Sequence, residues 1–205
     1  MFDKRSVINN IEKIVIAILI ALFIRTFIVQ AFNIPSGSME PTLLPGDYIL
    51  VNKFIYGIRI PYMNIKIFSY NEPKRGDVIV FIYPKDRSKD FIKRVIGMQG
   101  ETVQIIGGKI YIDNTLISDP WGYFDEKVAP DFIAAVENFG PVLVPEGSLF
   151  VMGDNRNRSE DSRFWGFLPL NNVLGKSFII YFSWDREAEN LSGKVRWSRI
   201  GKLIH

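Results

Sequence analysis

The sequence predicts a mainly β protein preceded by one N-terminal transmembrane helix. Residues 14–24 are an uninterrupted run of eleven apolar side chains near the start of the chain. From Asn33 onward, short runs rich in Val, Ile, Tyr and Phe alternate with turn residues such as Gly, Pro, Asp and Asn. Short runs bounded in this way are typical of β-strands. The 205 residues suit one domain, or one domain with a sizeable insertion.

The membrane anchor is predicted over residues 14–32. Eleven helical residues span only about 16 Å, too short for a hydrocarbon core of about 30 Å. Extending the helix to Phe32 gives roughly 28 Å and places Arg25 inside it, where its long side chain can snorkel to the headgroups. A cleaved signal peptide ending at Ala31 and a buried core helix are the alternatives. Arg25 argues against the first, and the lack of a polar face argues against the second.

Basic residues set the expected orientation of the anchor. Lys4, Arg5 and Lys13 precede or begin the apolar run. The positive-inside rule therefore places residues 1–13 in the cytoplasm and the rest of the chain outside it.

The β part is expected to follow the anchor directly. Its expected strands cover residues 48–51, 78–83, 91–96, 101–106, 109–112, 149–152 and 178–182. Gly107 and Gly108, between two of these runs, predict a two-residue hairpin. Residues 113–147 are less regular and contain four prolines. We expect a smaller lobe to be inserted there.

The composition excludes several kinds of chemistry. The chain has no cysteine, which rules out disulfides, thiolate metal sites and cysteine nucleophiles. Its one histidine, His205, is the last residue, so a Ser-His-Asp triad has no well-positioned imidazole. The net charge of +3 is spread along the chain and does not suggest a nucleic-acid partner. Any hydrolytic chemistry must use a base other than histidine.

Three segments could carry that chemistry. In residues 35–42, Ser36 and Ser38 flank one glycine and lie between two prolines. This composition predicts either a stiff loop that presents a hydroxyl or simply a turn. In residues 91–97, strand alternation puts Phe91, Lys93 and Val95 on one apolar face and Arg94 on the other. A buried lysine has a lowered pKa and can act as a base, although an edge-strand lysine reaching into water is the simpler interpretation. Residues 153–163 are a charge-dense loop between apolar segments, which indicates either a surface loop or a site scaffold.

Taken together, the segments resemble the sequence boxes of bacterial type I signal peptidases. The matching residues are Pro35-Ser36-Gly37-Ser38-Met39 with Pro45-Gly46-Asp47, then Arg75-Gly76-Asp77-Val78, then Lys93-Arg94-Val95-Ile96-Gly97, and finally Gly153-Asp154-Asn155-Arg156 with Ser159, Asp161, Ser162 and Arg163. The resemblance covers about residues 10–185. Four boxes in order after an apolar N-terminal segment are far more specific than a lone serine motif.

The resemblance implies a role for each matching residue. Ser38 would be the nucleophile and Lys93 the general base. The Ser36 hydroxyl and the Ser38 backbone amide would form the oxyanion hole, and Ser159 would orient the Lys93 amine. A supporting ion-pair cluster would comprise Asp161, Arg163 and Arg94. Shallow pockets for small side chains at positions −1 and −3 of a signal peptide would be lined by Phe32, Ile34, Met39, Phe91 and Ile92.

The resemblance also implies an architecture and a location. The fold would be an antiparallel β-sheet catalytic core, residues 33–104 and 149–205, with an inserted non-catalytic β lobe at residues 105–148. The protein would be a monomer crossing the bacterial inner membrane once, with its catalytic domain on the periplasmic side. Neither a cofactor nor a metal is implied. Asn157 and Arg158 depart from the family, which commonly has Asp-Asn at these positions, so the role of that pair in the loop is open.

Two other functions fit part of the sequence. A self-cleaving repressor-type protease shares the Ser/Lys chemistry, but no helix-turn-helix pattern precedes Ser38. A non-enzymatic, membrane-tethered β-domain would leave Ser38 and Lys93 merely structural. A covalent serine probe distinguishes this last hypothesis from the two enzymes.

Overall fold

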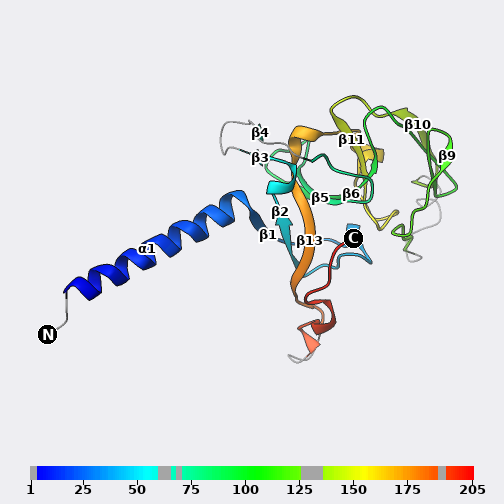
Figure 1. Cartoon of the computed structure of the whole chain (residues 1–205). Helices are drawn as coiled ribbons and strands as arrows, with labels where there is room; N and C mark the ends of the chain where they lie inside the picture. Colours follow the sequence, from blue (N-terminus) through cyan, green and yellow to red (C-terminus); the bar gives the residue numbers. More distant parts are fainter. Residues whose placement is uncertain (1–3, 60–65, 68–70, 126–135, 189–192) are drawn as a thin grey trace.

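The protein consists of one long helix followed by a β body, shown in the computed structural model in Figure 1. The structure describes residues 4–59, 66–67, 71–125, 136–188 and 193–205. The helices are α1 (Lys4–Phe27) and the short α3 (Ser162–Trp165). The strands are β1 (Val29–Asn33), β2 (Asp47–Asn52), β3 (Ile58–Arg59), β4 (Lys66–Ile67), β5 (Val78–Ile82), β6 (Asp90–Gly97), β7 (Thr102–Ile106), β8 (Lys109–Ile112), β9 (Thr115–Leu116), β10 (Phe139–Leu143), β11 (Ser148–Met152), β12 (Leu168–Pro169) and β13 (Val173–Ser183).

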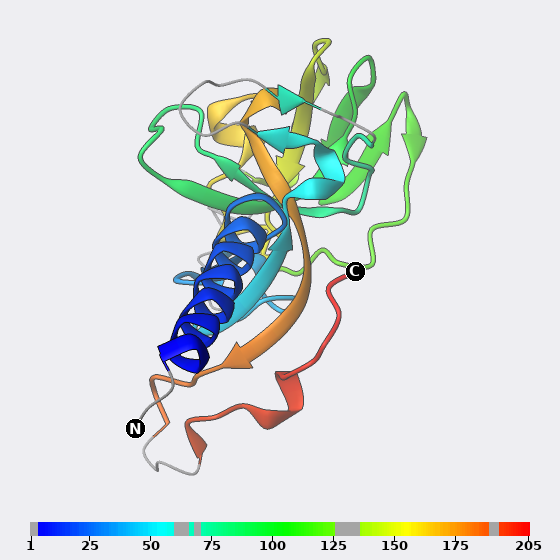
Figure 2. The same cartoon turned by 60° about the vertical axis from the view of Figure 1, so that its left-hand side comes forward.

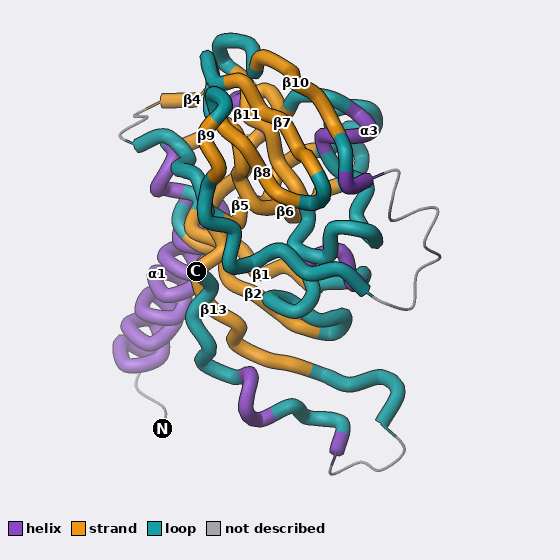
Figure 3. Tube along the Cα trace, turned by 90° about the vertical axis from the view of Figure 1, so that its right-hand side faces the viewer, coloured by secondary structure: helices purple, strands orange, loops and turns teal. Residues whose placement is uncertain are grey.

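The described strands form three antiparallel sheets. The largest has seven strands in the order β1-β2-β13-β5-β6-β11-β12, and a second has the order β10-β7-β8-β9. A two-stranded sheet pairs β3 with β4. Strands β7 to β10 gather at one end of the body, away from α1 and β1 (Figures 1 and 3). The prediction of a mainly β, antiparallel fold is confirmed, whereas the exact limits of a core and an inserted lobe stay predictions.

The predicted anchor at residues 14–32 needs correction. Helix α1 ends at Phe27, and Val29–Asn33 is strand β1, which pairs along its whole length with β2. Backbone pairing with β2 draws these five residues into the sheet, so they cannot extend the helix. Within the part of the chain that the structure describes, no helix is long and apolar enough to cross a membrane.

The last long strand is also longer than predicted. Strand β13 begins at Val173, whereas the sequence predicted a start at residue 178. Gly175 and Lys176 interrupt the apolar pattern there, which hid the first half of the strand. A Cβ at Gly175 would lie 2.4 Å from the Asn52 carbonyl oxygen, so glycine permits the close approach to β2.

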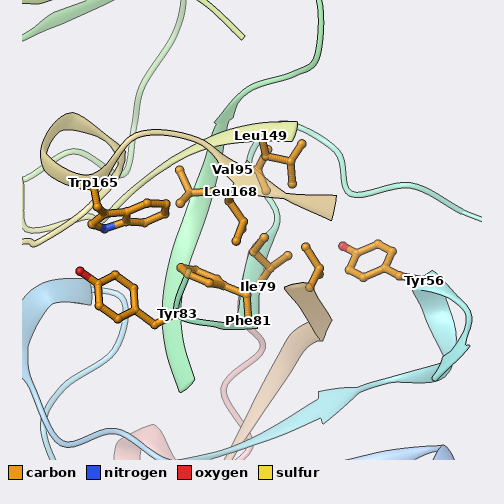
Figure 4. Close-up of a cluster of buried hydrophobic side chains, with 10 residues drawn as sticks. Tyr56, Ile79, Phe81, Tyr83, Val95, Leu149, Trp165 and Leu168 are labelled. Carbon is orange, nitrogen blue, oxygen red and sulfur yellow. The ribbon is translucent and has the colours of Figure 1, made fainter. Parts of the chain in front are cut away.

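The core lies on both faces of β5 and β6. Ile79 and Phe81 of β5 pack in one cluster with Val95 of β6, shown in Figure 4, while Val78 and Val80 pack in a second cluster on the opposite face. Such two-sided burial explains the continuous apolar run in β5. The side chain of a lysine on β6 is therefore surrounded by apolar groups, and its amine needs a polar partner.

Candidate functional site

Ser38 lies in a single 3₁₀ turn, Gly37–Met39, between β1 and β2. The next side chain, Met39, is fully buried and packs in the same cluster as Ile34 and Ile49. Ser38 itself is 9% exposed, and the Ser36 hydroxyl donates to its Oγ at 3.5 Å. Met39 thus anchors the turn in the core and leaves the Ser38 hydroxyl at the surface of that core.

Lys93 approaches Ser38 from strand β6. Its Nζ donates to Ser38 Oγ at 2.8 Å and to the Ile92 carbonyl at 3.0 Å. The side chain is 4% exposed and its Nζ lies 5.5 Å from the centre of the Phe91 ring. Val95 belongs to the cluster shown in Figure 4 and Phe91 packs against that cluster, so the apolar environment predicted for Lys93 is present.

Burial changes the protonation of the Lys93 amine. Removal from water disfavours the ammonium form and lowers the pKa of Lys93 to about 8. The negative charges of Asp161, Glu160 and Asp154 act in the opposite direction, but desolvation is the larger effect. A substantial fraction of this amine is therefore neutral near pH 8, and a neutral amine at 2.8 Å can accept the Ser38 proton.

The 153–163 loop approaches Ser38 through its backbone. Asn155 N–H donates to the Ser38 carbonyl at 3.2 Å. A Cβ on Gly153 would lie 2.4 Å from that carbonyl oxygen and 2.2 Å from Ser159 Oγ, so only glycine fits here. Ser159 Oγ accepts a hydrogen bond from Gly153 N–H at 3.1 Å. The suggested contact of Ser159 with the Lys93 amine stays a prediction.

The arginines of the expected ion-pair cluster belong to two separate pairs. Arg163 binds Asp161, which also accepts from Gly153 N–H at 3.0 Å and caps α3. Arg94 instead forms a bidentate pair with Asp154, at 2.8 and 2.7 Å, and both side chains are fully buried. Arg94 lies on the strand face opposite Lys93, as alternation predicted. The sequence predicted no particular role for Asp154, although it directly follows Gly153 in the last of the four matching boxes.

The two residues that depart from the family pattern contact a distant segment. The Asn157 side-chain amide donates to the Asp125 carbonyl at 2.8 Å and its oxygen accepts from Asp125 N–H at 2.9 Å. Arg158 forms an ion pair with the Asp125 carboxylate at 3.0 Å. Arg156 pairs with Asp119 close by. In this chain, Asn157 and Arg158 therefore hold the loop against Asp125, and Arg156 holds it against Asp119.

A cleft of about 680 Å³ opens onto Ser38 and Lys93. Of the predicted pocket residues, Phe91 and Ile92 line it, whereas Ile34 and Met39 are buried and Phe32 packs against the core beside them. Sequence reasoning missed several charged lining residues that come from four separate segments: Glu40, Asp90, Arg158, Glu160 and Glu187. Their separation along the chain left no local pattern to identify them.

The site brings together a serine hydroxyl and a buried lysine amine. Among the described residues, no group of three or more His, Cys, Asp or Glu side chains is placed to hold a metal ion. A hydroxyl, an amine with a lowered pKa and an adjacent cleft can together support acyl transfer.

Similarity to known proteins identifies the family of this chain. Residues 7–184 match the family model described as signal peptidase, peptidase S26. A signal peptidase I of Pseudomonas fluorescens is 38% identical over 214 residues, covering 90% of this chain and 75% of that protein. A signal peptidase I of Aquifex aeolicus is 38% identical over 228 residues, covering 85% of this chain and 84% of that protein. The chain thus belongs to the signal peptidase family, peptidase S26.

Proposed function

We propose that the chain removes N-terminal signal peptides from exported preproteins, with Ser38 as nucleophile and Lys93 as general base. The observation that carries this proposal is the 2.8 Å contact between Lys93 Nζ and Ser38 Oγ at the end of an open cleft. The names of the relatives, each a signal peptidase I, support the substrate class.

The reaction has two halves. Ser38 Oγ attacks the scissile carbonyl carbon while the neutral Lys93 amine takes the hydroxyl proton. The tetrahedral intermediate collapses, the C–N bond breaks, and the Lys93 ammonium returns the proton to the departing amine. Water then attacks the carbonyl carbon of the Ser38 ester while Lys93 accepts its proton. The second tetrahedral intermediate collapses, the bond between the carbonyl carbon and Ser38 Oγ breaks, and the Lys93 ammonium returns the proton to Ser38 Oγ as the acid product leaves. Lys93 thus serves as base and acid in turn, the part that histidine has in the classical triad.

Ser36 would stabilise the oxyanion together with the Ser38 backbone amide. Its hydroxyl is only two residues from the nucleophile and points at Ser38 Oγ, 3.5 Å away. Rotation of the hydroxyl about its Cβ–Oγ bond would redirect this donor towards a substrate oxygen held next to Ser38. Donors fixed before the reaction stabilise the charge that develops in the transition state.

Specificity would arise from the walls of the cleft. Phe91 and Ile92 line it, and the buried Met39 and Ile34 support the turn that carries Ser38. Apolar walls next to the nucleophile favour small side chains at positions −1 and −3 of the substrate, because larger ones would displace packed groups.

The catalytic body would work next to a lipid bilayer. Apolar side chains on α1 are unusually exposed, with Ile14, Leu19 and Phe23 at 58%, 60% and 56%. The helix stands away from the β body in Figure 1, and it lies in front of the body in Figure 2, where the left-hand side of Figure 1 comes forward. The body therefore does not cover these residues. An exposed apolar surface of this kind indicates contact with lipid.

Replacing either member of the pair should abolish cleavage. Ser38→Ala and Lys93→Ala should each lower turnover of a signal peptide carrying Ala at −1 and −3 by at least about 1000-fold, and the double variant should be hardly worse, because the two residues act as one unit. Turnover is measured with purified full-length protein in detergent. The matched controls Ser88→Ala and Lys109→Ala should retain activity, and a peptide with Phe at −1 should resist cleavage. Wild-type turnover in Lys93→Ala would overturn the mechanism.

Removing the Ser36 hydroxyl should slow the chemical step. Ser36→Ala should reduce kcat roughly 100- to 1000-fold with little change in KM, because the donor acts mainly on the transition state. Ser36→Thr keeps a hydroxyl and should retain part of the lost rate. Steady-state kinetics of the three proteins test this, and an unchanged kcat in Ser36→Ala would remove Ser36 from the oxyanion hole.

The rate should follow the ionisation of Lys93. Only the neutral amine accepts the serine proton, and its fraction grows as the pH rises through the pKa of about 8. The value of kcat/KM should therefore rise about tenfold per pH unit below 8 and level off above it. A pH profile of wild type and His205→Ala measures this. A rise in kcat/KM with its midpoint at or above pH 10 would mean that Lys93 is solvated and is not the base. A rise with its midpoint near pH 6.5 that vanished in His205→Ala would mean that the histidine is the base.

A further inference from the structure

A groove of about 800 Å³ lies where α1 joins the β body. Its walls come from the last turns of α1, from the start of β1 and from β2. Apolar side chains make most of the wall, among them Leu22, Val29 and Leu50. It is separate from the catalytic cleft, with which it shares no lining residue.

Strand register brings two cations to this groove. Arg25 lies in the last turn of α1, and Lys53 directly follows β2. Val29 of β1 pairs with Asn52 of β2, and Lys53 N–H donates to the Ile28 carbonyl at 2.9 Å. Arg25 and Lys53, which are 28 positions apart in the sequence, therefore line the same groove.

The charge of the lining is of one sign. The described residues that line the groove include Arg25 and Lys53 and no carboxylate, with Gln30 as the other polar side chain. Beyond the groove, exposed apolar residues such as Ile14, Ile18 and Leu19 continue along α1 towards its start. Two cations at the end of an apolar surface match a molecule with an anionic head and a hydrocarbon tail.

We propose that this groove binds one anionic phospholipid. Its phosphate lies between Arg25 and Lys53, and an acyl chain lies along the groove wall and the exposed side of α1. The inference rests on the membrane contact proposed above and adds to it a defined lipid site with a preference for headgroup charge. Bound lipid would link α1 to β1 and β2 and so fix the height of the body above the bilayer.

Native mass spectrometry of the full chain in neutral detergent tests this proposal, with dioleoyl phosphatidylglycerol or dioleoyl phosphatidylcholine added. Wild type should retain one phosphatidylglycerol in preference to phosphatidylcholine. Arg25→Gln/Lys53→Gln should weaken retention of phosphatidylglycerol about tenfold or more and leave phosphatidylcholine unaffected. The matched control Arg87→Gln/Lys109→Gln removes the same charges from exposed positions outside the groove and should behave as wild type. Arg25→Lys/Lys53→Arg should retain the preference.

Three results would overturn the lipid site. The first is equal retention of both lipids by wild type, and the second is an equal loss of phosphatidylglycerol in the groove and control variants. The third is displacement of the lipid by an equal concentration of inorganic phosphate, because the acyl chain should favour the lipid. Ser38→Ala should bind phosphatidylglycerol as wild type does, so the lipid site and the proteolytic function can fail independently.

Discussion

The contact between a buried amine and a serine hydroxyl is the interaction on which the rest of the site depends. Lysine in water has a pKa of about 10.4 and is almost wholly protonated at neutral pH, so a base at this position requires an apolar enclosure. That enclosure is built by Phe91 and Val95 on the same face of β6 and by the cluster that covers it. The loop at Gly153 completes it by packing its backbone against the Ser38 carbonyl.

Strand alternation keeps a second cation away from the amine. Arg94 follows Lys93 directly but points to the other face, where Asp154 binds it in a buried bidentate pair. The guanidinium also donates to the carbonyls of Gly76 and His205, at 2.6 and 2.7 Å. One strand thus carries both the site lysine and an arginine that joins the 153–163 loop to the end of the chain. Losing the Arg94–Asp154 pair would leave a buried charge uncompensated, which typically costs about 3–5 kcal/mol.

Local patterns predicted much of this arrangement. Three features depend on fewer than ten consecutive residues each: the turn at Ser38, the apolar face around Lys93, and the hairpin of β7 and β8. The end of the first helix was predicted wrongly because residues 28–32 are mostly apolar, like the run before them, and only pairing with β2 decides their structure. The Arg94–Asp154 pair, the Asp125 contacts and the charged rim of the cleft join distant segments, so no local pattern could reveal them.

Direct titration of the Lys93 amine tests the central claim most closely. The full chain, labelled with ¹⁵N at lysine Nζ and studied by NMR in detergent, should show one Nζ resonance with a midpoint near pH 8, absent from Lys93→Ala. A Lys93 midpoint at or above 10 would mean that its amine is hydrated and protonated at working pH, and would contradict the account of Lys93 as the base.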